Sequence, residues 1–426
     1  MKLRGVWGDS DQAVQRVPGG RRVSRQSLPW LLGPAFVAAV AYVDPGNVAA
    51  NITAGAQYGY LLVWVLVVAN VMAMLVQYLS AKLGLVTGHS LPELLGKRLP
   101  RGRRLMFWAQ AETVAAATDL AEVIGGAIAL HILFGLPLLM GGLLIGLVSM
   151  LLLAVQSRHG QRPFEFVIVG LLVVITVGFL TGMFIGTVSW SEALAGVVPR
   201  FEGTPTVVLA ASMLGATVMP HAIYAHSSLA RDRHGDTIAP EALPRLLRIT
   251  RWDVLLSLLV AGSVNIAMLL LAAGNLNGIP GTDSIEGAHA AITATLGPAV
   301  GVAFGVGLLA SGLASTSVGC YAGSTIMGGL LHRQIPQVVR RAVTLVPALA
   351  VIAIGVEPTW ALVLSQVVLS LGIPFALIPL VVLNSDRTLM GGFAIRVPLR
   401  VASWVVVALI VSLNLALIGL LASGRG

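Results

Sequence analysis

Charged residues and cysteine are both scarce in this chain of 426 residues. Only 11% of the residues are Asp, Glu, Lys or Arg, whereas soluble globular domains carry roughly 25%. The single cysteine, Cys320, can form neither an internal disulfide nor a thiolate metal cluster. These shortages exclude a water-soluble enzyme and a disulfide framework, and any metal site must use ligands other than cysteine.

Hydrophobic residues are abundant instead, at 56% of the chain, with a mean hydropathy of +0.88. The 48 Gly and 21 Pro residues fall inside apolar stretches, where membrane helices tolerate them. Uncharged stretches repeatedly reach the roughly 20 residues that a membrane-spanning helix needs. The pattern predicts an all-α polytopic membrane protein with eleven transmembrane helices, over residues 28–59, 61–83, 105–131, 136–156, 164–188, 205–230, 253–274, 298–331, 337–356, 358–383 and 401–423.

The distribution of positive charge predicts how these helices are oriented. The net charge is +9, and 25 of the 27 Lys and Arg residues fall on one side if the amino terminus is cytoplasmic. Only Arg200 and Arg425 remain outside, as the positive-inside rule requires. We therefore expect a plasma-membrane protein with an external carboxyl terminus. The basic residues do not gather into one domain, so membrane lipid rather than nucleic acid is the expected partner.

Two predicted spans contain sequences that interrupt a helix. The first span contains Asp44-Pro45-Gly46-Asn47, where proline removes a backbone donor and glycine favours non-helical dihedral angles. The sixth span contains Met219-Pro220-His221, in which Pro220 can begin a new half-helix. An odd number of spans separates the two breaks, which gives the two halves opposite orientations. Paired interruptions of this kind are typical of the midplane binding site of a secondary transporter.

The residues at the breaks are suited to binding a cation. Asp44 offers an anionic oxygen, Asn47 an amide oxygen and Met219 a thioether, and the unwound segments offer carbonyls such as those of Ala41 and Ala216. Charge and softness together favour a transition metal over Mg²⁺ or Ca²⁺, which prefer all-oxygen shells. The alternative is that Met219 packs in the core and the proline is a structural kink. An ionisable group in the bilayer is costly, so for Asp44 we favour function.

The third span carries three acids, Glu112, Asp119 and Glu122, at spacings that place them roughly on one helical face. Acids in a membrane span should face a polar pathway or basic partners. The intramembrane candidates for these partners are His221, His226, Arg340 and Arg341. Two alternatives remain open, because Arg340 is also consistent with a cytoplasmic anchor and His226 with a packing histidine.

At these residues the sequence resembles the Nramp family of proton-coupled divalent metal transporters. The resemblance rests on Asp44-Pro45-Gly46-Asn47 and Met219-Pro220-His221, and extends through Ala117–Glu122, Ala310-Ser311-Gly312 and Gln366 with Pro374–Pro379. It implies a LeuT-like five-plus-five inverted repeat with broken helices 1 and 6. The corresponding regions are a polar cytoplasmic tail at 1–26, a first repeat at 27–190, a second repeat at 204–384, and helix 11 with the carboxyl terminus at 397–426.

The resemblance also implies a function and a set of site residues. The function is import of Mn²⁺, Fe²⁺, Co²⁺ or Cd²⁺ with protons by alternating access, with the metal as cargo and no cofactor. The implied metal ligands are Asp44, Asn47, Met219, Ala216, Ala41 and Gln366. The family pattern assigns proton movement to Asp119, Glu122, His221 and Arg341, and it assigns no role to Glu112. The proton pathway that we expect also includes Asp44, His226 and Arg340.

Other functional classes explain less of the sequence. A sodium- or proton-coupled symporter of a small organic solute on the same fold accounts for the breaks, but not for Met219 beside Asp44. A channel accounts for polar residues in membrane spans without requiring inverted, discontinuous helices. An intramembrane hydrolase lacks support, because the chain contains neither Gly-x-Ser-x-Gly nor His-Glu-x-x-His. The sequence therefore favours a transporter over an enzyme.

Overall fold

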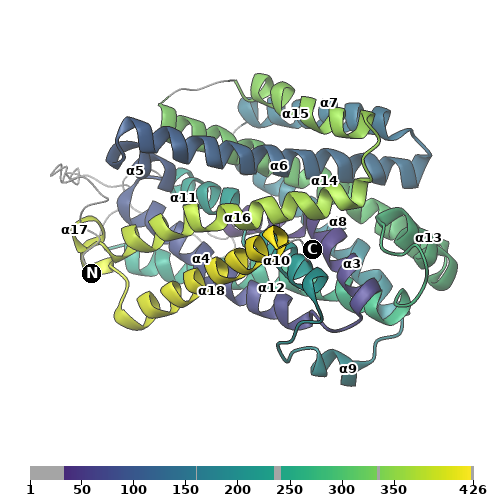
Figure 1. The fold of residues 1–426 in the computed structure, drawn as a ribbon. Coiled ribbons are helices and arrows are strands. Elements are labelled where there is room, and N and C mark those ends of the chain that lie inside the picture. The colour runs from purple at the N-terminus through teal and green to yellow at the C-terminus, as the bar shows by residue number, and fades with distance from the viewer. Residues whose placement is uncertain (1–32, 160, 235–240, 333–335, 424–426) are drawn as a thin grey trace.

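The computed structural model describes residues 33–159, 161–234, 241–332 and 336–423, and these residues form helices and no β-strand (Figure 1). The predicted tail at 1–26 and the start of the first predicted span lie outside the described residues. Two long segments are interrupted: α2 (Pro34–Val40) continues through η2 (Ala41–Val43) to α3 (Pro45–Tyr58), and α10 (Thr204–Thr217) is followed by α11 (Pro220–His234). The other long helices are α4 (Val63–Thr87), α6 (Arg101–Phe134), α7 (Leu138–His159), α8 (Gln161–Ile185), α12 (Leu243–Asn275), α14 (Pro298–Leu331), α15 (Gln337–Ala353), α16 (Pro358–Ser385) and α18 (Val397–Ala422).

Eight of the helical segments among the described residues are long and apolar enough to cross a membrane. One of them, Thr204–Arg233, includes both α10 and α11. The first interrupted segment and α7 have shorter apolar portions, Pro34–Val43 and Leu138–Leu151. The coarse prediction of a multi-spanning helical protein is therefore confirmed, since several of these helices reach the length of a bilayer crossing.

Short helices that were not predicted lie between the long ones. They are α5 (Leu91–Arg98), α9 (Trp190–Ala195), α13 (Ile285–Leu296) and α17 (Arg387–Met390). Local capping explains where three of them begin: Ser90 and Glu93 form a capping box at α5, Ser284 caps α13, and Asp386 caps α17. They are too short and too polar to stand out as long apolar runs in the sequence.

The two interrupted segments lie inside the bundle. α3 packs on α12 and α10, α11 packs on α4 and α14, and α16 contacts both α3 and α10. α14 and α16 each pack along α6, and Figure 1 shows α5 and α17 toward one end of the molecule and α9 and α13 toward the other. The residues of α11 from Pro220 to Ala230 are all buried.

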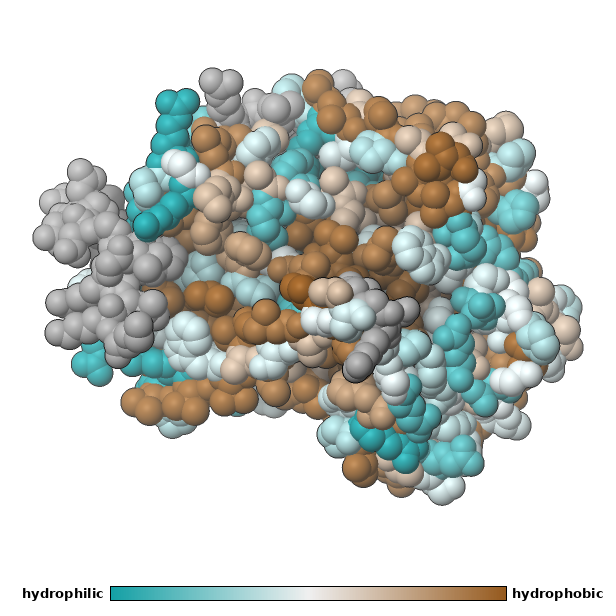
Figure 2. All heavy atoms as spheres, viewed as in Figure 1, coloured by the Kyte–Doolittle hydropathy of each residue, from teal (hydrophilic) through white to brown (hydrophobic). Residues whose placement is uncertain are grey.

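The outer surface is consistent with a lipid environment. Large apolar side chains are exposed on α8, including Phe166, Val173 and Phe184, at 76%, 57% and 83% of their surface. Figure 2 shows hydrophobic residues over the middle of one face, with hydrophilic residues mainly toward its two ends. A soluble protein rarely exposes so much contiguous apolar surface, whereas a bilayer covers it.

Candidate functional site

The first interruption is centred on Asp44. Helix α2 ends at Val40, and the backbone then continues through η2 to Asp44, which is extended (φ −73°, ψ 168°). Asp44 caps α3, because its Oδ1 accepts a 2.7 Å hydrogen bond from the backbone N–H of Asn47. Pro45 occupies the first position of α3, where its missing N–H costs nothing. The sequence Asp-Pro therefore ends one helix and begins the next.

Other helices hold the carbonyl groups of this interruption. Asn265 of α12 donates a 2.6 Å hydrogen bond to the Tyr42 carbonyl, and Ser311 of α14 donates one of 2.5 Å to the Val43 carbonyl. Asn51 of α3 donates in turn to Asn265 Oδ1 at 2.8 Å. The non-helical backbone is thus fixed by protein groups, as the absence of water in a membrane interior requires.

The second interruption lies between α10 and α11. Helix α10 ends at Thr217, Val218 has non-helical dihedral angles (φ −106°, ψ 63°), and Pro220 begins α11. Met219 lies between the two helices and is completely buried. The close contact of α10 with α16 depends on Gly215, since a Cβ atom there would lie 2.0 Å from the Gln366 carbonyl oxygen.

The two interruptions meet through an asparagine side chain. The Nδ2 group of Asn47 donates to Asp44 Oδ1 at 2.8 Å and to the Ala216 carbonyl at 3.0 Å. From α16, Gln366 Nε2 donates to Asp44 Oδ2 at 3.4 Å. This approach requires Gly46, because a Cβ atom there would lie 1.7 Å from Gln366 Nε2. Four of the predicted metal ligands are therefore in direct contact.

The remaining two predicted ligands lie close by in the chain. Ala41 precedes Asp44 by three residues and Met219 follows Ala216 by three, and both side chains are fully buried. Two buried amide oxygens, Asn47 Oδ1 and Gln366 Oε1, have no hydrogen-bond partner. Unpaired buried oxygens are costly, and a bound cation would satisfy them.

The donor set differs from that of most metalloproteins. Among the described residues, no group of three or more His, Cys, Asp or Glu residues could hold a metal ion. One carboxylate, two side-chain amides and the Ala216 carbonyl meet at the interruptions, and the buried Met219 thioether lies three residues further along the chain from Ala216. A site with one formal negative charge and one soft ligand is suited to a divalent transition metal.

A separate network of buried charge surrounds Arg341 of α15. Its Nη1 lies 2.9 Å from Asp119 Oδ1 and 3.9 Å from Glu122 Oε2, and the Arg341 side chain is fully buried. Arg341 also donates to Ser149 at 3.0 Å, and Ser315 donates to Glu122 Oε1 at 2.9 Å. The structure thus brings together three of the residues predicted for proton movement.

The structure does not support the alternative of Arg340 as a cytoplasmic anchor. Its side chain is only 5% exposed, and its Nη2 lies 2.9 Å from Glu112 Oε1. A snorkelling anchor would extend its charged group into water. Glu112, to which the sequence assigned no role, is therefore the partner of Arg340.

The two histidines of α11 have different surroundings. His221 Nδ1 lies 3.3 Å from the Thr118 hydroxyl, next in sequence to Asp119. His226 Nδ1 lies 2.7 Å from Gln77 Oε1, and Gln77 Nε2 donates to the Tyr42 hydroxyl at 2.5 Å. His221 therefore lies beside the acids of α6, whereas His226 belongs to a chain of neutral groups that leads to the first interruption.

Several neutral residues in these networks were not singled out from the sequence. They are Gln77, Ser149, Ser315 and Thr316. Asn265 belongs to the same group, and Ser311 was named only as part of a motif. A polar side chain within an apolar span was the available signal, but the sequence contains many such residues, and only the packing shows which ones reach a site.

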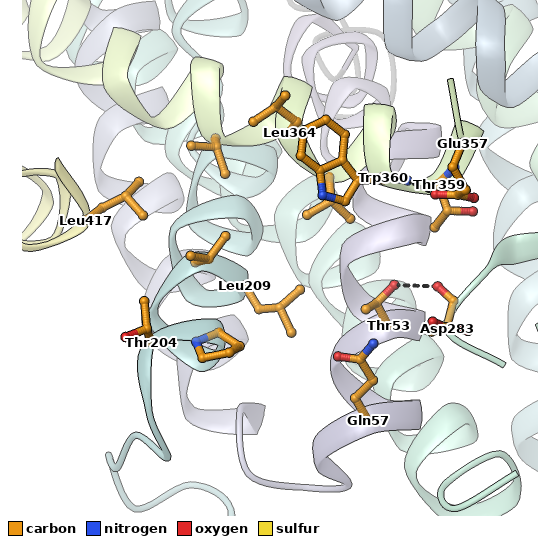
Figure 3. Close-up of a pocket in the computed structure, with 14 residues that line it drawn as sticks. Thr53, Gln57, Thr204, Leu209, Asp283, Glu357, Thr359, Trp360, Leu364 and Leu417 are labelled. Atoms are coloured by element: carbon orange, nitrogen blue, oxygen red, sulfur yellow. Dashed lines mark hydrogen bonds between the residues drawn. The ribbon is translucent and has the colours of Figure 1, made fainter. Parts of the chain in front are cut away.

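A pocket of ≈ 470 Å³ lies apart from Asp44 and Met219, between α3, α10, α16 and α18 (Figure 3). Apolar side chains such as Leu209 and Trp360 form much of its wall, and Asp283 and Glu357 lie at one end. Thr53 donates to the backbone carbonyl of Asp283 at 3.2 Å. Neither Asp44 nor Met219 is among its lining residues, so this pocket is distinct from the donor cluster.

The fold and the donor cluster define a helical membrane protein with two discontinuous helices that meet at a polar centre. A profile of the natural resistance-associated macrophage protein-like family, Nramp, matches residues 35–420. A divalent metal cation transporter of Mycobacterium tuberculosis, MntH, is 60% identical over 403 residues, which cover 95% of this chain and 94% of that protein. The chain belongs to the Nramp family.

Solved structures agree with this assignment. A manganese transporter of Eremococcus coleocola, crystallised with an aromatic bis-isothiourea compound, superposes with a TM-score of 0.83 at 29% identity, over 95% of this chain and 89% of that one. MhsT, in complex with L-phenylalanine, gives a TM-score of 0.59 at 16% identity, over 93% of this chain and 100% of that one. The second likeness concerns the fold alone. These relatives support a transporter rather than an enzyme.

Proposed function

We propose that this protein is a secondary transporter that imports divalent transition metal ions, Mn²⁺ foremost and also Fe²⁺, Co²⁺ and Cd²⁺, together with protons. One observation carries the proposal: the Asn47 amide bridges the Asp44 carboxylate and the Ala216 carbonyl across the two interrupted helices. A cation placed between these two oxygens would make the same attractive contacts as the amide N–H groups. The names of the relatives as metal cation and manganese transporters support this choice of cargo.

The ligands that we propose are the six that the sequence predicted: Asp44, Asn47, Met219, Ala216, Ala41 and Gln366. Rotation of the Asn47 side-chain amide would turn its unpaired Oδ1 toward the ion, and a corresponding rotation of the Gln366 amide would turn its unpaired Oε1 toward it. Among the carbonyls of η2, those of Tyr42 and Val43 already accept side-chain hydrogen bonds from α12 and α14, which favours Ala41 as the donor.

The proposed architecture has eleven membrane crossings and a LeuT-like five-plus-five inverted repeat. Its support is the occurrence of one interrupted segment, α2 to α3, in the first half and another, α10 to α11, in the second. We place the amino terminus in the cytoplasm and the carboxyl terminus outside the plasma membrane, because the Lys and Arg residues divide that way. The metal therefore enters along α3 and α10 and leaves along α2 and α11.

Protons are proposed to move through the network of α6, α11 and α15. Asp119 and Glu122 are both within 4 Å of one buried guanidinium, that of Arg341, and His221 lies beside the same turn of α6. Arg340 with Glu112 forms a second pair between the same two helices, α15 and α6. Asp44 links metal and proton movement, since a carboxylate can exchange one cation for the other.

The test is uptake into proteoliposomes that contain the purified protein, with metal and internal pH recorded together. We expect saturable Mn²⁺ uptake with acidification of the lumen, and competition by Fe²⁺, Co²⁺ and Cd²⁺ but not by Ca²⁺ or Mg²⁺. Uptake of an organic solute, with no response to any divalent metal, would instead support the symporter alternative. Metal uptake that left internal pH unchanged would remove the proton coupling from the proposal.

A further inference from the structure

Helix α12 is longer than a bilayer crossing, and its first turns carry positive charge. It contains 33 residues, which corresponds to about 50 Å of helix, whereas the hydrocarbon core of a bilayer is about 30 Å thick. In the orientation proposed above, its first turns therefore lie in the layer of lipid headgroups on the cytoplasmic side. Arg245, Arg248 and Arg251 lie in these turns, and all three are exposed.

The exposed residues of α12 continue along one face of the helix. Arg245 and Arg248 are followed by Trp252, Leu256 and Leu259, at spacings of three or four residues that correspond to about one turn each. The three apolar side chains are 52%, 41% and 50% exposed. This face is thus basic at its start and apolar further along, in the same order as the headgroup and the acyl chain of a phospholipid.

The opposite face of α12 is fixed inside the protein. Val254 and Leu258 are buried. Asp253 accepts hydrogen bonds from Gly33 N at 3.1 Å and Ala35 N at 3.0 Å, at the start of α2. The first N–H groups of a helix have no intrahelical acceptor, so this carboxylate is a cap supplied by another helix. The basic and apolar face is therefore held toward the lipid.

The charge of these arginines is not compensated by nearby acids. None of the ion pairs between described residues involves Arg245, Arg248 or Arg251. Glu241 is exposed four residues before Arg245 and offsets part of its charge. Arg248 and Arg251 are three residues apart, so their side chains are neighbours on the helix surface. Two guanidinium groups are thus available to bind an anion.

Two neighbouring helices border the basic end of this face. The charge of Arg251 acts on the Tyr78 hydroxyl of α4. Phe393, shortly before α18, packs on the start of α12 in a cluster that includes Leu243. Arg396 follows Phe393 by three residues and is also exposed. A headgroup bound at the start of α12 would therefore meet polar and basic groups from three elements.

We propose that this face of α12 binds an anionic phospholipid of the cytoplasmic leaflet. Arg248 and Arg251 hold the headgroup phosphate, since a guanidinium group matches the geometry of phosphate oxygens. Trp252 lies one turn beyond Arg248, at the membrane interface where tryptophan is enriched. One acyl chain follows Leu256 and Leu259.

The length of the apolar stripe agrees with one acyl chain. From Trp252 to Leu259 the helix rises about 10 Å, which is less than the roughly 15 Å depth of the hydrocarbon region in one leaflet. A single chain therefore covers the whole stripe. The proposal rests on the orientation proposed above and not on the identity of the transported ion.

Other basic residues of the cytoplasmic side provide a matched control. Lys97 of α5 and Arg387 of α17 are also exposed, but their short helices expose no large apolar side chain. General attraction to an anionic membrane would act on these residues as well. A lipid site requires the basic end and the apolar stripe together, which α12 has and these two helices lack.

The experiment measures lipid binding to the purified full-length protein in detergent, by native mass spectrometry. Dioleoyl phosphatidylglycerol is compared with dioleoyl phosphatidylcholine, which has the same chains but no net charge. We expect tighter binding of phosphatidylglycerol. Replacing Arg248→Gln together with Arg251→Gln should weaken it roughly 30-fold, about fivefold for each charge.

Two further pairs of substitutions separate charge from position. Lys97→Gln with Arg387→Gln changes the net charge by the same amount and should leave the affinity unchanged. Arg248→Lys with Arg251→Lys should retain most of the affinity, because lysine also binds phosphate as a point charge.

A second measurement locates the acyl chain. The emission of Trp252 is isolated as the difference between the wild type and Trp252→Phe, in nanodiscs that contain a small fraction of lipid brominated in its chains. Brominated phosphatidylglycerol should quench this emission more strongly than brominated phosphatidylcholine. The paired Arg248→Gln and Arg251→Gln variant should lose that preference.

Several results would overturn the site. Equal affinity for the two lipids, or equal quenching by their brominated forms, would show that the face contacts lipid without selecting it. An equal loss in the Lys97 and Arg387 control would indicate general attraction to the cytoplasmic surface. Displacement of phosphatidylglycerol by inorganic phosphate at equal concentration would indicate an anion site that needs no lipid. None of these measurements depends on transport, so failure of the lipid site and failure of the proposed function are distinguishable.

Discussion

Asp44 and Asp119 are both buried carboxylates in helical membrane segments, but their partners differ. Asp44 accepts hydrogen bonds from the neutral amides of Asn47 and Gln366, and among the described residues it forms no ion pair. Asp119 lies 2.9 Å from the guanidinium of Arg341. A carboxylate with neutral partners leaves its charge available to a cation, whereas a carboxylate beside arginine is already compensated.

In the function proposed above, this difference assigns metal binding to one region and proton transfer to the other. A divalent ion needs a net negative centre with flexible donors, and the two interruptions provide it. Proton transfer needs titratable groups close to one another, and α6 and α15 provide a chain of acids and arginines.

The strongest test of this division is Asp44→Ala, which removes the only formal charge at the metal centre. We expect metal uptake and coupled proton entry to fall below detection, since the remaining donors are neutral. Proteoliposome uptake measures both. The isosteric variant Asp44→Asn should fail equally, and wild-type uptake in either folded variant would move the centre elsewhere.

Asp119→Asn should produce a large but different loss. The buried Arg341 then keeps only Glu122, at 3.9 Å, as an acidic partner among the described residues. We therefore expect the free energy of unfolding to fall by at most about 3–5 kcal/mol. Proton flux should fall more than Mn²⁺ affinity, measured by lumenal pH and by calorimetry. Glu112→Gln is the matched comparison for the loss of stability, because it breaks the similar but more exposed pair with Arg340. A large loss of affinity with unchanged proton flux would reverse the assignment.

Met219→Ala should have a smaller effect that depends on the ion. The thioether contributes more to Cd²⁺ than to Mn²⁺ and least to Mg²⁺ or Ca²⁺. We therefore expect Cd²⁺ affinity to fall most, some Mn²⁺ transport to remain, and Ca²⁺ or Mg²⁺ entry to increase in competition assays. The cavity should also lower stability by about 2–5 kcal/mol. Equal loss for all ions would remove Met219 from the ligand set.

The sequence predicted the interruptions because their causes are local. Pro45 lacks a donor, Asp44 caps the next helix three residues ahead, and Pro220 begins α11, so each effect acts within one turn. Long apolar runs likewise predicted most of the spanning helices, since burial in lipid depends on composition. These features require no knowledge of how the helices pack.

Features that depend on packing could not be predicted in the same way. Arg340 and Glu112 are 228 residues apart, and only the meeting of α15 with α6 joins them. The same holds for Asp253, which caps a helix start more than 200 residues away. The role of Gly46 could not be predicted either, because it depends on the Gln366 side chain, which occupies the space where a Cβ atom of residue 46 would lie. The positions of these residues along the sequence do not indicate which of them are in contact.

The smallest effect is expected at Asp386, an acid outside both regions. It caps α17 and lies 3.0 Å from Arg98, with side chains that are 24% and 29% exposed. Asp386→Ala should cost about 1 kcal/mol through loss of the cap and leave uptake unchanged. Asp386→Asn keeps a capping side chain and should cost less. Normal Mn²⁺ uptake in both variants would show that the loss of a carboxylate does not by itself stop transport.

The pH dependence of this small contribution has a definite sign. Burial raises the pKa of Asp386, but hydrogen bonds from Thr388 and Arg98 outweigh it and hold the pKa below its ordinary value. A lowered pKa in the folded protein stabilises it above the ordinary value of about 3.9, and the contribution is lost as pH falls through the folded pKa. Thermal unfolding of wild type and Asp386→Asn should therefore differ by the same amount at pH 5 and pH 7. A difference that disappeared between these two values would mean that Arg98 does not stabilise the charged form.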